Sequence, residues 1–466
     1  MTLSYEAFEV GLCRRRVAST VVDVFDFWVL SASALSSMVP RPKPVHVSNQ
    51  DKRSSTMNVS LTVNGKVNGS QLDEDIGTLA PVTFAVIGCG QRGTAYAEYA
   101  LRAPDKCKVV AIAEPRPKTR TAMATAHSVD ASLVFHTWED FHAASVETLK
   151  TTVALAFASQ GYHILCEKPM ATSVEDCVRI ADAVKKAGII FGMGHVLRYS
   201  PYSKAMTKII HSGSLGRLIN IQYLEPIGHY HFAHSYVRGS WSKENDSSFS
   251  LMTKSSHDID IICSMLAPET PIRVSSFGSL QHFKKAAKPP AAGDATRCLD
   301  CSIEQECPYS AKSIYLDRVK SGNTRWPAST IVDGVPDIEN INEALQNGPY
   351  GKCVYESDND VVDNQTCLAS PSPTSAHSHA PPVSQQRRQC TAPRRKAGGH
   401  GGGDLGLIST FVRAVRTGQQ DLLGTDVDEV LKSHLAVFAA EKSRLEGRVI
   451  NVAEFEKEAK TMFLEH

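Results

Sequence analysis

The sequence has 466 residues, a length that suits two or three domains of ordinary size rather than one compact core. Hydrophobic residues make up 42% and charged residues 21%, which is typical of a globular protein in water, and we expect a cytoplasmic protein with no membrane partner. Fifty basic and 49 acidic residues leave a net charge of +1, which gives no support for a nucleic-acid partner held by bulk electrostatics. Twelve cysteines are too sparse for a disulfide scaffold.

Residues 1–80 are expected to form an extension outside the folded cores. The main apolar stretch, residues 17–35, follows three arginines and is interrupted by Asp23 and Asp26. A charge inside a membrane or signal segment costs roughly 2.5–3.5 kcal/mol on insertion scales. Residues 40–75 are rich in Pro, Ser and Asn, which favours a poorly ordered segment over a targeting signal.

A glycine-rich turn follows the first clear strand pattern. Residues 83–87 (TFAVI) read as a buried strand, and residues 94–102 have helical composition. The GxGxxG motif lies between them, with Gly88 for the tight turn, Gly90 for close approach of a pyrophosphate and Gly93 for helix packing. Gln91 and Arg92 occupy the variable positions of this motif. The pattern predicts a dinucleotide-binding turn, and the alternative is a glycine-rich turn in a fold that binds something else.

The second predicted strand, residues 108–113, ends at Glu114, which lies 21 residues after Gly93. An acid at this spacing hydrogen-bonds a ribose 2′-hydroxyl in dinucleotide-binding folds. Arg116 could instead meet a 2′-phosphate, so NAD and NADP both remain candidates.

The alternation of helices and strands continues to residue 194. We expect helices at 117–126, 153–160 and 173–186, and strands at 133–136, 161–166 and 189–194. The strand at 161–166 ends in Glu167-Lys168-Pro169. No apolar β run exists between Glu139 and Thr152, so no strand is expected there.

The GxGxxG motif, Glu114 and Glu167-Lys168-Pro169 together resemble the Gfo/Idh/MocA family of glucose–fructose oxidoreductases and inositol dehydrogenases. The resemblance covers about residues 81–365 and 398–466. It implies an α/β fold with an N-terminal Rossmann domain (81–198), followed by an α/β domain (199–466) built on a large, mostly antiparallel sheet. It also implies hydride transfer between NAD or NADP and the carbinol carbon of a sugar, polyol or related alcohol. A homo-oligomer through the C-terminal sheet is expected.

The resemblance assigns roles to particular side chains. Gln91, Arg92, Glu167 and Lys168 join the cofactor-binding set, and Lys168 is placed near the nicotinamide and the substrate hydroxyl. A buried lysine has a lowered pKa, which suits this chemistry. His257 matches the family's proton-relay histidine, and Arg198-Tyr199 matches a substrate-contacting segment.

The second catalytic segment departs from the family. Thr253 stands where the family has an acid, and Lys254 follows it as a candidate substrate-contacting cation. Lys254 and His257 lie three residues apart and are expected to share a helical face. Asp258 and Asp260 could orient the histidine or cap the helix, with a structural role preferred for Asp260.

A cysteine cluster marks an insertion at about residues 285–353. Cys298-x₂-Cys301-x₅-Cys307 lies in a polar loop, and Cys353 begins a predicted strand at 352–357. Four such thiols suit a structural zinc site. The alternative is a set of free thiols. A third function remains open, in which the zinc loop is a partner-docking module.

Two segments disagree with the family pattern. The family has a further strand where residues 139–152 lie, and residues 367–397 are rich in Pro, Ser, Gln and Arg, a composition expected to be disordered and unable to form strands. These departures favour a gene-model or splicing difference. They also leave room for a rival function, a non-catalytic nucleotide-binding or sensor protein that has lost turnover.

Overall fold

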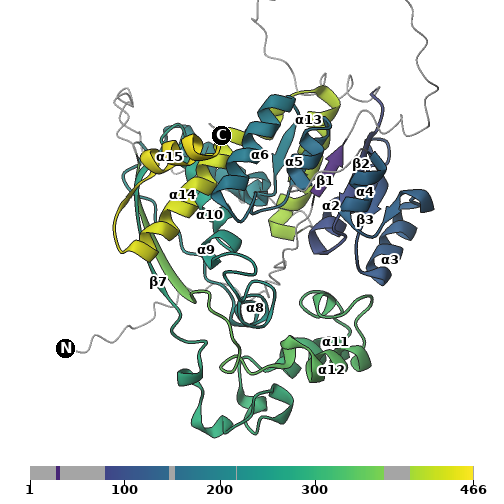
Figure 1. Ribbon diagram of the computed structural model, residues 1–466, viewed down its shortest axis with the longest axis vertical. Coiled ribbons are helices and arrows are strands. Elements are labelled where there is room, and N and C mark those ends of the chain that lie inside the picture. Colours follow the sequence, from purple (N-terminus) through teal and green to yellow (C-terminus); the bar gives the residue numbers. More distant parts are fainter. Residues whose placement is uncertain (1–27, 32–78, 146–152, 217, 372–398, 465–466) are drawn as a thin grey trace, which may run out of the picture.

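A computed structural model describes residues 28–31, 79–145, 153–216, 218–371 and 399–464, shown as coloured ribbon in Figure 1. Its first domain is built on a six-stranded sheet with the order β4-β3-β2-β1-β5-β6. Five strands run parallel to one another: β2 (Val82–Ile87), β3 (Cys107–Ala113), β4 (Val134–Phe135), β5 (His163–Cys166) and β6 (Phe191–Met193). These strands confirm the Rossmann prediction for the N-terminal domain.

The sixth strand, β1 (Trp28–Ser31), comes from the N-terminal extension and runs antiparallel to both of its neighbours, β2 and β5. It occupies the centre of the sheet, where the sequence predicted a missing strand. Without it, β2 and β5 would each present a row of unpaired backbone groups, which a segment of either direction can satisfy. The expectation that all of residues 1–80 lie outside the cores is therefore wrong for residues 28–31. The rest of that extension lies outside the described residues, apart from 79 and 80.

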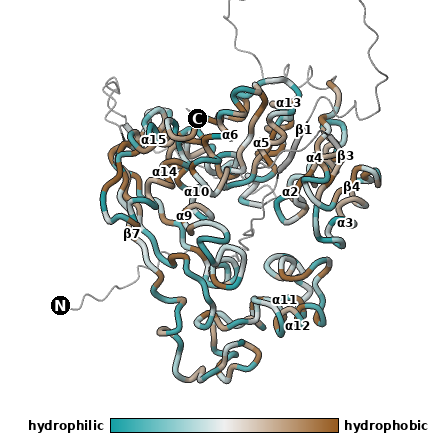
Figure 2. The backbone as a smooth tube through the Cα atoms, in the orientation of Figure 1, coloured by the Kyte–Doolittle hydropathy of each residue, from teal (hydrophilic) through white to brown (hydrophobic). Residues whose placement is uncertain are grey.

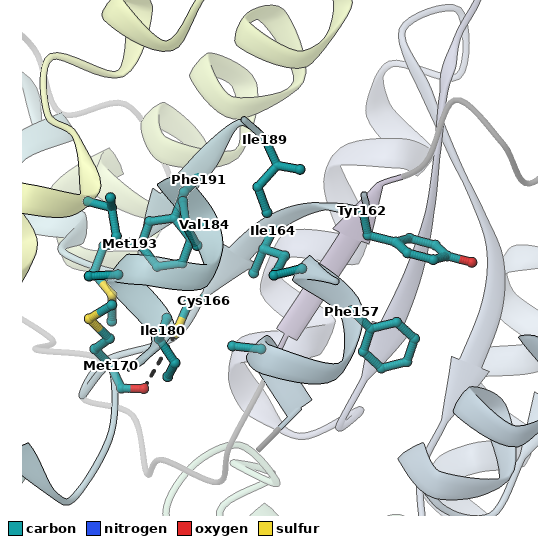
Figure 3. Packing of buried hydrophobic residues seen from close by; sticks show 14 of the residues in the cluster. Phe157, Tyr162, Ile164, Cys166, Met170, Ile180, Val184, Ile189, Phe191 and Met193 are labelled. Carbon is teal, nitrogen blue, oxygen red and sulfur yellow. Dashed lines mark hydrogen bonds between the residues drawn. The ribbon is translucent and has the colours of Figure 1, made fainter. Parts of the chain in front are cut away.

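Alternate residues of β2 face opposite sides of the sheet, as the two-residue period of a strand requires. Phe84 and Val86 pack against α2 (Gln91–Arg102), α3 (Pro117–His127) and α13 (Gly403–Thr417). Ala85 and Ile87 pack against α4 (Trp138–Ser145), α5 (Val153–Ala158), α6 (Val174–Ala187) and α14 (Val427–Glu446). Figure 3 shows part of this second core, in which Ile164 and Phe191 from the sheet lie near Ile180 and Val184 of α6. Helix α13, far along the chain, thus completes the first domain.

The second sheet has three described strands, in the order β8-β7-β9, and all of its pairings are antiparallel. They are β7 (Pro271–Ser279), β8 (Asn364–Pro371) and β9 (Ile450–Asn451). The prediction of an antiparallel C-terminal sheet is confirmed. Strand β8 corrects a second expectation, because Cys367 to Pro371 pair with β7 although this composition was expected not to form strands. The partner strand supplies the hydrogen bonds that local sequence preference does not indicate. Residues 372–398 lie outside the described residues.

Helices α14 and α15 (Val452–Leu464) cover one face of this sheet, as the yellow ribbons in Figure 1 show. The remaining helices of this half of the chain are α7 (Pro201–His211), α8 (His229–Phe232), α9 (Ser250–Thr253), α10 (Ser256–Leu266), α11 (Asp317–Lys320) and α12 (Ile338–Asn347). In the described part of the chain, no helix has the length and apolar character that a membrane crossing needs.

The insertion between β7 and β8 is folded around an aromatic core that it shares with residues 232–241. Tyr315 and Ala328 are fully buried there, and Phe283 stacks on Phe232 with ring centroids 5.1 Å apart. In Figure 2 the tube through this part of the chain mixes white, brown and teal, which matches a small core between polar loops. The strand predicted at 352–357 is not formed. Lys352 makes only an isolated bridge to Arg297.

Candidate functional site

A cavity of about 620 Å³ opens where β2 and β3 end. Its volume lies in the range of small-molecule and cofactor sites. The glycine-rich turn forms one wall, and Glu114 with Arg116 forms another. The residues that line it are Ile87, Gly88, Cys89, Gly90, Gln91, Arg92, Gly93, Thr94, Ala113, Glu114, Pro115, Arg116, Thr119, Thr137, Trp138, Glu139, Ser329 and Thr330.

The glycine-rich turn has the backbone that a pyrophosphate needs. Gly88 has φ +82°, a conformation that glycine adopts without steric cost, and its N–H donates to the carbonyl of Ala113 at 2.8 Å. Gly90 is the N-cap of α2, and no side chain in the described part of the chain caps this helix. The first N–H groups of α2 therefore face the cavity with the positive end of the helix dipole. These features fit a dinucleotide phosphate group.

Glu114 is buried beside the turn. Its carboxylate accepts from the backbone N–H of Cys89 at 2.7 Å and from Nε of Arg116 at 2.7 Å. Burial raises the pKa of this carboxyl, but the hydrogen bonds and charge of Arg116 outweigh burial and lower the pKa overall. The acid is therefore ionised and faces the cavity, where the sequence placed a ribose-binding group.

Lys168 lies in the turn that follows β5, and it is partly buried. Its Nζ donates to the backbone carbonyl of Thr253 at 2.5 Å. Burial, with a contribution from the positive charge of Lys254, lowers the pKa of Lys168 to about 8. The lysine that the sequence singled out thus titrates close to neutral pH, as a catalytic acid or base requires.

Thr253, Lys254 and His257 lie where helix α9 ends and α10 begins. The expected shared helical face of Lys254 and His257 is interrupted, because α9 ends at Thr253 and α10 begins at Ser256. Both side chains are nevertheless buried and electrostatically coupled to Lys168. The break therefore does not separate the three residues predicted to share the chemistry.

His257 has an acidic neighbour in sequence. Its Nδ1 lies 2.8 Å from Oδ1 of Asp258, which also accepts from the hydroxyl of Tyr223 at 3.0 Å. Burial is the main cause that lowers the pKa of His257, and the positive charges of Lys168 and Lys254 lower it further. The charge and hydrogen bond of Asp258 raise this pKa, but the net shift is downward. The imidazole is therefore neutral at pH 7 and can accept a proton.

Residues 82–195 match the family described as an oxidoreductase family with an NAD-binding Rossmann fold, Gfo/Idh/MocA. Through these residues the first domain of the chain is similar to the Gfo/Idh/MocA oxidoreductase family. It is 25% identical over 207 residues to 2,7-anhydro-N-acetylneuraminate hydratase of Escherichia coli (strain K12), covering 43% of this chain and 54% of that protein. It is 28% identical over 142 residues to inositol 2-dehydrogenase of Burkholderia cenocepacia (strain HI2424), covering 28% of this chain and 42% of that protein.

The chain spans about half the length of the curated relatives it matches. Among solved structures, scyllo-inositol dehydrogenase from Lactobacillus casei is similar with a TM-score of 0.47 and 13% identity. That match covers 81% of this chain and 99% of the other.

Arg92 and Glu167, which the resemblance assigned to cofactor binding, make hydrogen bonds within the protein. Arg92 borders the cavity, but its guanidinium donates to Glu167 and Asp404 at 2.8 Å each and contacts the Tyr96 hydroxyl. Glu167 is buried and accepts from the Lys168 backbone N–H at 3.0 Å. The structure places Glu167 behind the Lys168 turn, where it supports the turn rather than lining the described cavity.

Gly194 explains why Glu167 fits there. A Cβ at residue 194 would lie 2.7 Å from the carboxyl carbon of Glu167, closer than real Cβ contacts occur. The glycine therefore leaves room for the carboxylate that positions the lysine turn.

The predicted substrate-contacting pair, Arg198 and Tyr199, is also engaged elsewhere. Arg198 forms a bidentate ion pair with Asp260, at 2.6 and 2.8 Å, and Tyr199 is buried and donates to the carbonyl of Leu423 at 2.9 Å. His195 Nδ1 lies 2.9 Å from the same Asp260. These contacts engage both side chains of the pair within the protein, and they support a structural role for Asp260.

The four cysteines of the insertion, Cys298, Cys301, Cys307 and Cys353, line one cavity of about 30 Å³. However, no group of three or more His, Cys, Asp or Glu residues in the described part of the chain is placed to hold a metal ion. The thiol of Cys298 lies 3.2 Å from Nη2 of Arg238, which donates to it. The predicted zinc site is therefore not supported, although the four residues do come together around the insertion's core.

Sequence reasoning missed several residues of the cavity. Thr137, Trp138 and Glu139 reach it from the start of α4, and Ser329 and Thr330 reach it from the insertion. The first group closely follows the short strand β4, so its position after a strand end is a local signal that could have found it. No local pattern indicates the second group, because more than 200 residues separate it from the glycine-rich turn.

Proposed function

We propose that this chain is an NAD(P)-dependent oxidoreductase that transfers a hydride between nicotinamide and the carbinol carbon of a sugar, polyol or related alcohol. One observation carries the proposal. The Lys168 amine, with its pKa lowered to about 8, is coupled to the Lys254 and His257–Asp258 groups and lies on a turn that Glu167 and Arg92 connect to the dinucleotide cavity. The inositol 2-dehydrogenase among the relatives supports the polyol class of substrate.

The side chains divide the proton chemistry between them. A bound nicotinamide supplies the acceptor or donor of the hydride. Neutral His257 takes the hydroxyl proton during alcohol oxidation, and Asp258 stabilises the imidazolium that forms. The Lys168 ammonium donates a hydrogen bond to the substrate oxygen as negative charge develops there, and the Lys254 cation adds to this field.

A second candidate function rests on the reversed central strand. Because β1 is antiparallel, its first residue, Trp28, pairs with Ile87 and Cys166 at the edge where the parallel strands end. A parallel strand at this position would end there and continue into a turn beside the cofactor. The loss of that turn, together with Thr253 in place of an acid, supports a non-catalytic nucleotide-binding sensor as the alternative.

A titration followed by a substrate screen tests the two functions. Purified protein is titrated with NADH and NADPH by fluorescence, and sugars and polyols are then screened for a change in absorbance at 340 nm. The oxidoreductase predicts turnover that Lys168→Met abolishes and that Lys185→Met, at an exposed ion pair on α6, leaves unchanged. Binding without turnover on any substrate supports the sensor. Absence of binding contradicts both functions.

A homo-oligomer through the second sheet belongs to the same proposal. Phe277 and Leu368 are 66% and 64% exposed, and their register places them on one face of β7 and β8, opposite buried Val274. Exposed apolar side chains on a sheet face favour a covering partner. Sedimentation of the wild-type protein and of Phe277→Lys tests the assignment. We expect the wild type to sediment as an oligomer and the variant as a smaller species, and a monomeric wild type would contradict it.

A further inference from the structure

The insertion reaches into the dinucleotide cavity. Ser329 and Thr330 line it, and the Ser329 hydroxyl accepts from the Gln91 side-chain amide at 2.7 Å. Of the preceding residues, Ala328 is buried in the aromatic core of the insertion, and Trp326 is buried against His231 and His234. These contacts anchor the segment. In Figure 1, helices α11 and α12 of the insertion lie below α3 and the end of the first sheet. The cofactor cavity is therefore walled on one side by a part of the chain outside the Rossmann domain.

Asp333 of the same segment lies against the N-terminus of α3. Its carboxylate accepts from the backbone N–H groups of Lys118 and Thr119 at 3.0 Å each, and from the Thr119 hydroxyl at 2.8 Å. Although burial raises its pKa, these hydrogen bonds and the charge of Arg116 lower the pKa overall, so the side chain carries a full negative charge at neutral pH. The anion-binding end of α3 is thus already filled by a carboxylate.

This position matters because Thr119, which supplies two of the three groups that donate to Asp333, also lines the cofactor cavity. Helix α3 begins just after Glu114 and Arg116, at the place where the sequence expects the adenosine ribose. A 2′-phosphate at that ribose would need the free N–H groups of α3 and the guanidinium of Arg116. However, Asp333 already accepts from these N–H groups, and Glu114 accepts from Nε of the Arg116 guanidinium at 2.7 Å.

We propose that Asp333 is a specificity-determining residue that excludes the 2′-phosphate of NADP(H), so that the cavity selects NAD(H). The inference rests on the proposed dinucleotide site and adds the choice between the two cofactors. The positive groups facing the region are Arg116, Lys118 and Arg120, and the negative groups are Glu114 and Asp333. Removing Asp333 makes this region more positive, because one of its two negative groups is lost, and it opens the N–H donors of α3.

Equilibrium titration of the full chain with NADH and with NADPH tests the proposal. We expect the wild type to bind NADH at least about tenfold more tightly, and Asp333→Ala to bind NADPH about tenfold more tightly than the wild type does. The NADH affinity of the variant should stay within about twofold, because the 2′-hydroxyl partner Glu114 is retained. Asp333→Asn removes the charge but keeps a side-chain oxygen that can accept from the N–H groups of α3. Its gain in NADPH affinity should therefore be smaller than that of Asp333→Ala, and its fold should be less disturbed.

The matched control is Asp337→Ala. Asp337 caps α12 in the same insertion, accepting from the Asn340 N–H at 2.7 Å, and it does not line the described cavity. This variant should leave both affinities unchanged. Equal affinity of the wild type for the two cofactors, or equal effects of Asp333→Ala on both, would overturn the inference while leaving the proposed function intact. Failure of the wild type to bind either cofactor would overturn both.

Discussion

The Nζ atom of Lys168 donates to the backbone carbonyl of Thr253 at 2.5 Å, across 85 residues of sequence. This hydrogen bond joins the turn after β5 to the break between α9 and α10. It brings a lysine of the first domain to the segment that carries Lys254 and His257. The candidate site thus depends on the contact between the two domains, and changes on either side should alter the ionisation of Lys168.

The rate of alcohol oxidation should follow a bell-shaped pH profile. The acidic limb reports protonation of His257, whose pKa burial holds below its ordinary value of 6.5. The basic limb reports loss of the Lys168 proton at a pKa of about 8, so the rate falls as the pH rises through that value. The measurement is kcat/KM against pH with the alcohol found in the screen.

Lys254→Met tests the origin of the basic limb. Burial is the main cause of the lowered pKa of Lys168, and the charge of Lys254 adds to it. Removing that charge should therefore raise the pKa of Lys168 and move the basic limb to higher pH. A basic limb that stays in place, or moves down, would contradict the coupling of the two lysines.

Asp258→Asn should slow turnover by about tenfold to a hundredfold, with a smaller effect on KM, because the imidazolium of His257 loses its stabilising carboxylate. The same loss lowers the pKa of His257, since Asp258 raises it. The acidic limb of the profile should therefore move to lower pH. Asp105→Asn, at an exposed acid, is the matched control and should change neither quantity. An unchanged acidic limb in Asp258→Asn would show that this pair does not set it.

The sequence predicted best what is local. The strand, the glycines, helix α2 and the acid at the end of β3 follow one another within 33 residues, and each signal depends on near neighbours. The N-cap of α6 is another such case, since the Ser173 hydroxyl accepts from the Asp176 N–H at 3.0 Å. The lysine turn directly follows a buried strand, but it was the resemblance of Glu167-Lys168-Pro169 to the family pattern that singled out Lys168.

The contacts that sequence did not predict join distant segments. Arg92 and Asp404 are 312 residues apart, and Arg198 and Asp260 are 62 apart, so no spacing rule relates them. An arginine that is read as free to bind a ligand can be neutralised by such a partner. The antiparallel strand β1 could not be predicted either, because a run of four residues, three of them apolar, indicates neither the direction of a strand nor its position in a sheet.

Asp404→Ala should lower the free energy of unfolding by about 3 kcal/mol, the lower end of the cost of breaking a buried ion pair. Asp404 and Arg92 are both buried, and the change removes one of the two carboxylates that hold the guanidinium. Urea unfolding measures the change. Glu98→Ala removes the exposed partner of Arg102 and should cost less than about 0.5 kcal/mol. Equal effects of the two substitutions would show that the buried network does not stabilise the fold.

Leu30→Pro should destabilise the first domain by roughly 1–3 kcal/mol, because proline removes a backbone donor and leaves a buried acceptor unpaired. Leu30 lies opposite Ala85 of β2 and Ile164 of β5, so strand β1 has a neighbour on each side and its N–H groups belong to one ladder or the other. Leu30→Val keeps the N–H and a β-forming side chain, and it should remain close to the wild type. Urea unfolding and limited proteolysis of the three proteins make the comparison. If the proline and valine variants unfold at the same urea concentration, Trp28–Ser31 does not supply the central strand, and the gap between β2 and β5 must be filled by another segment.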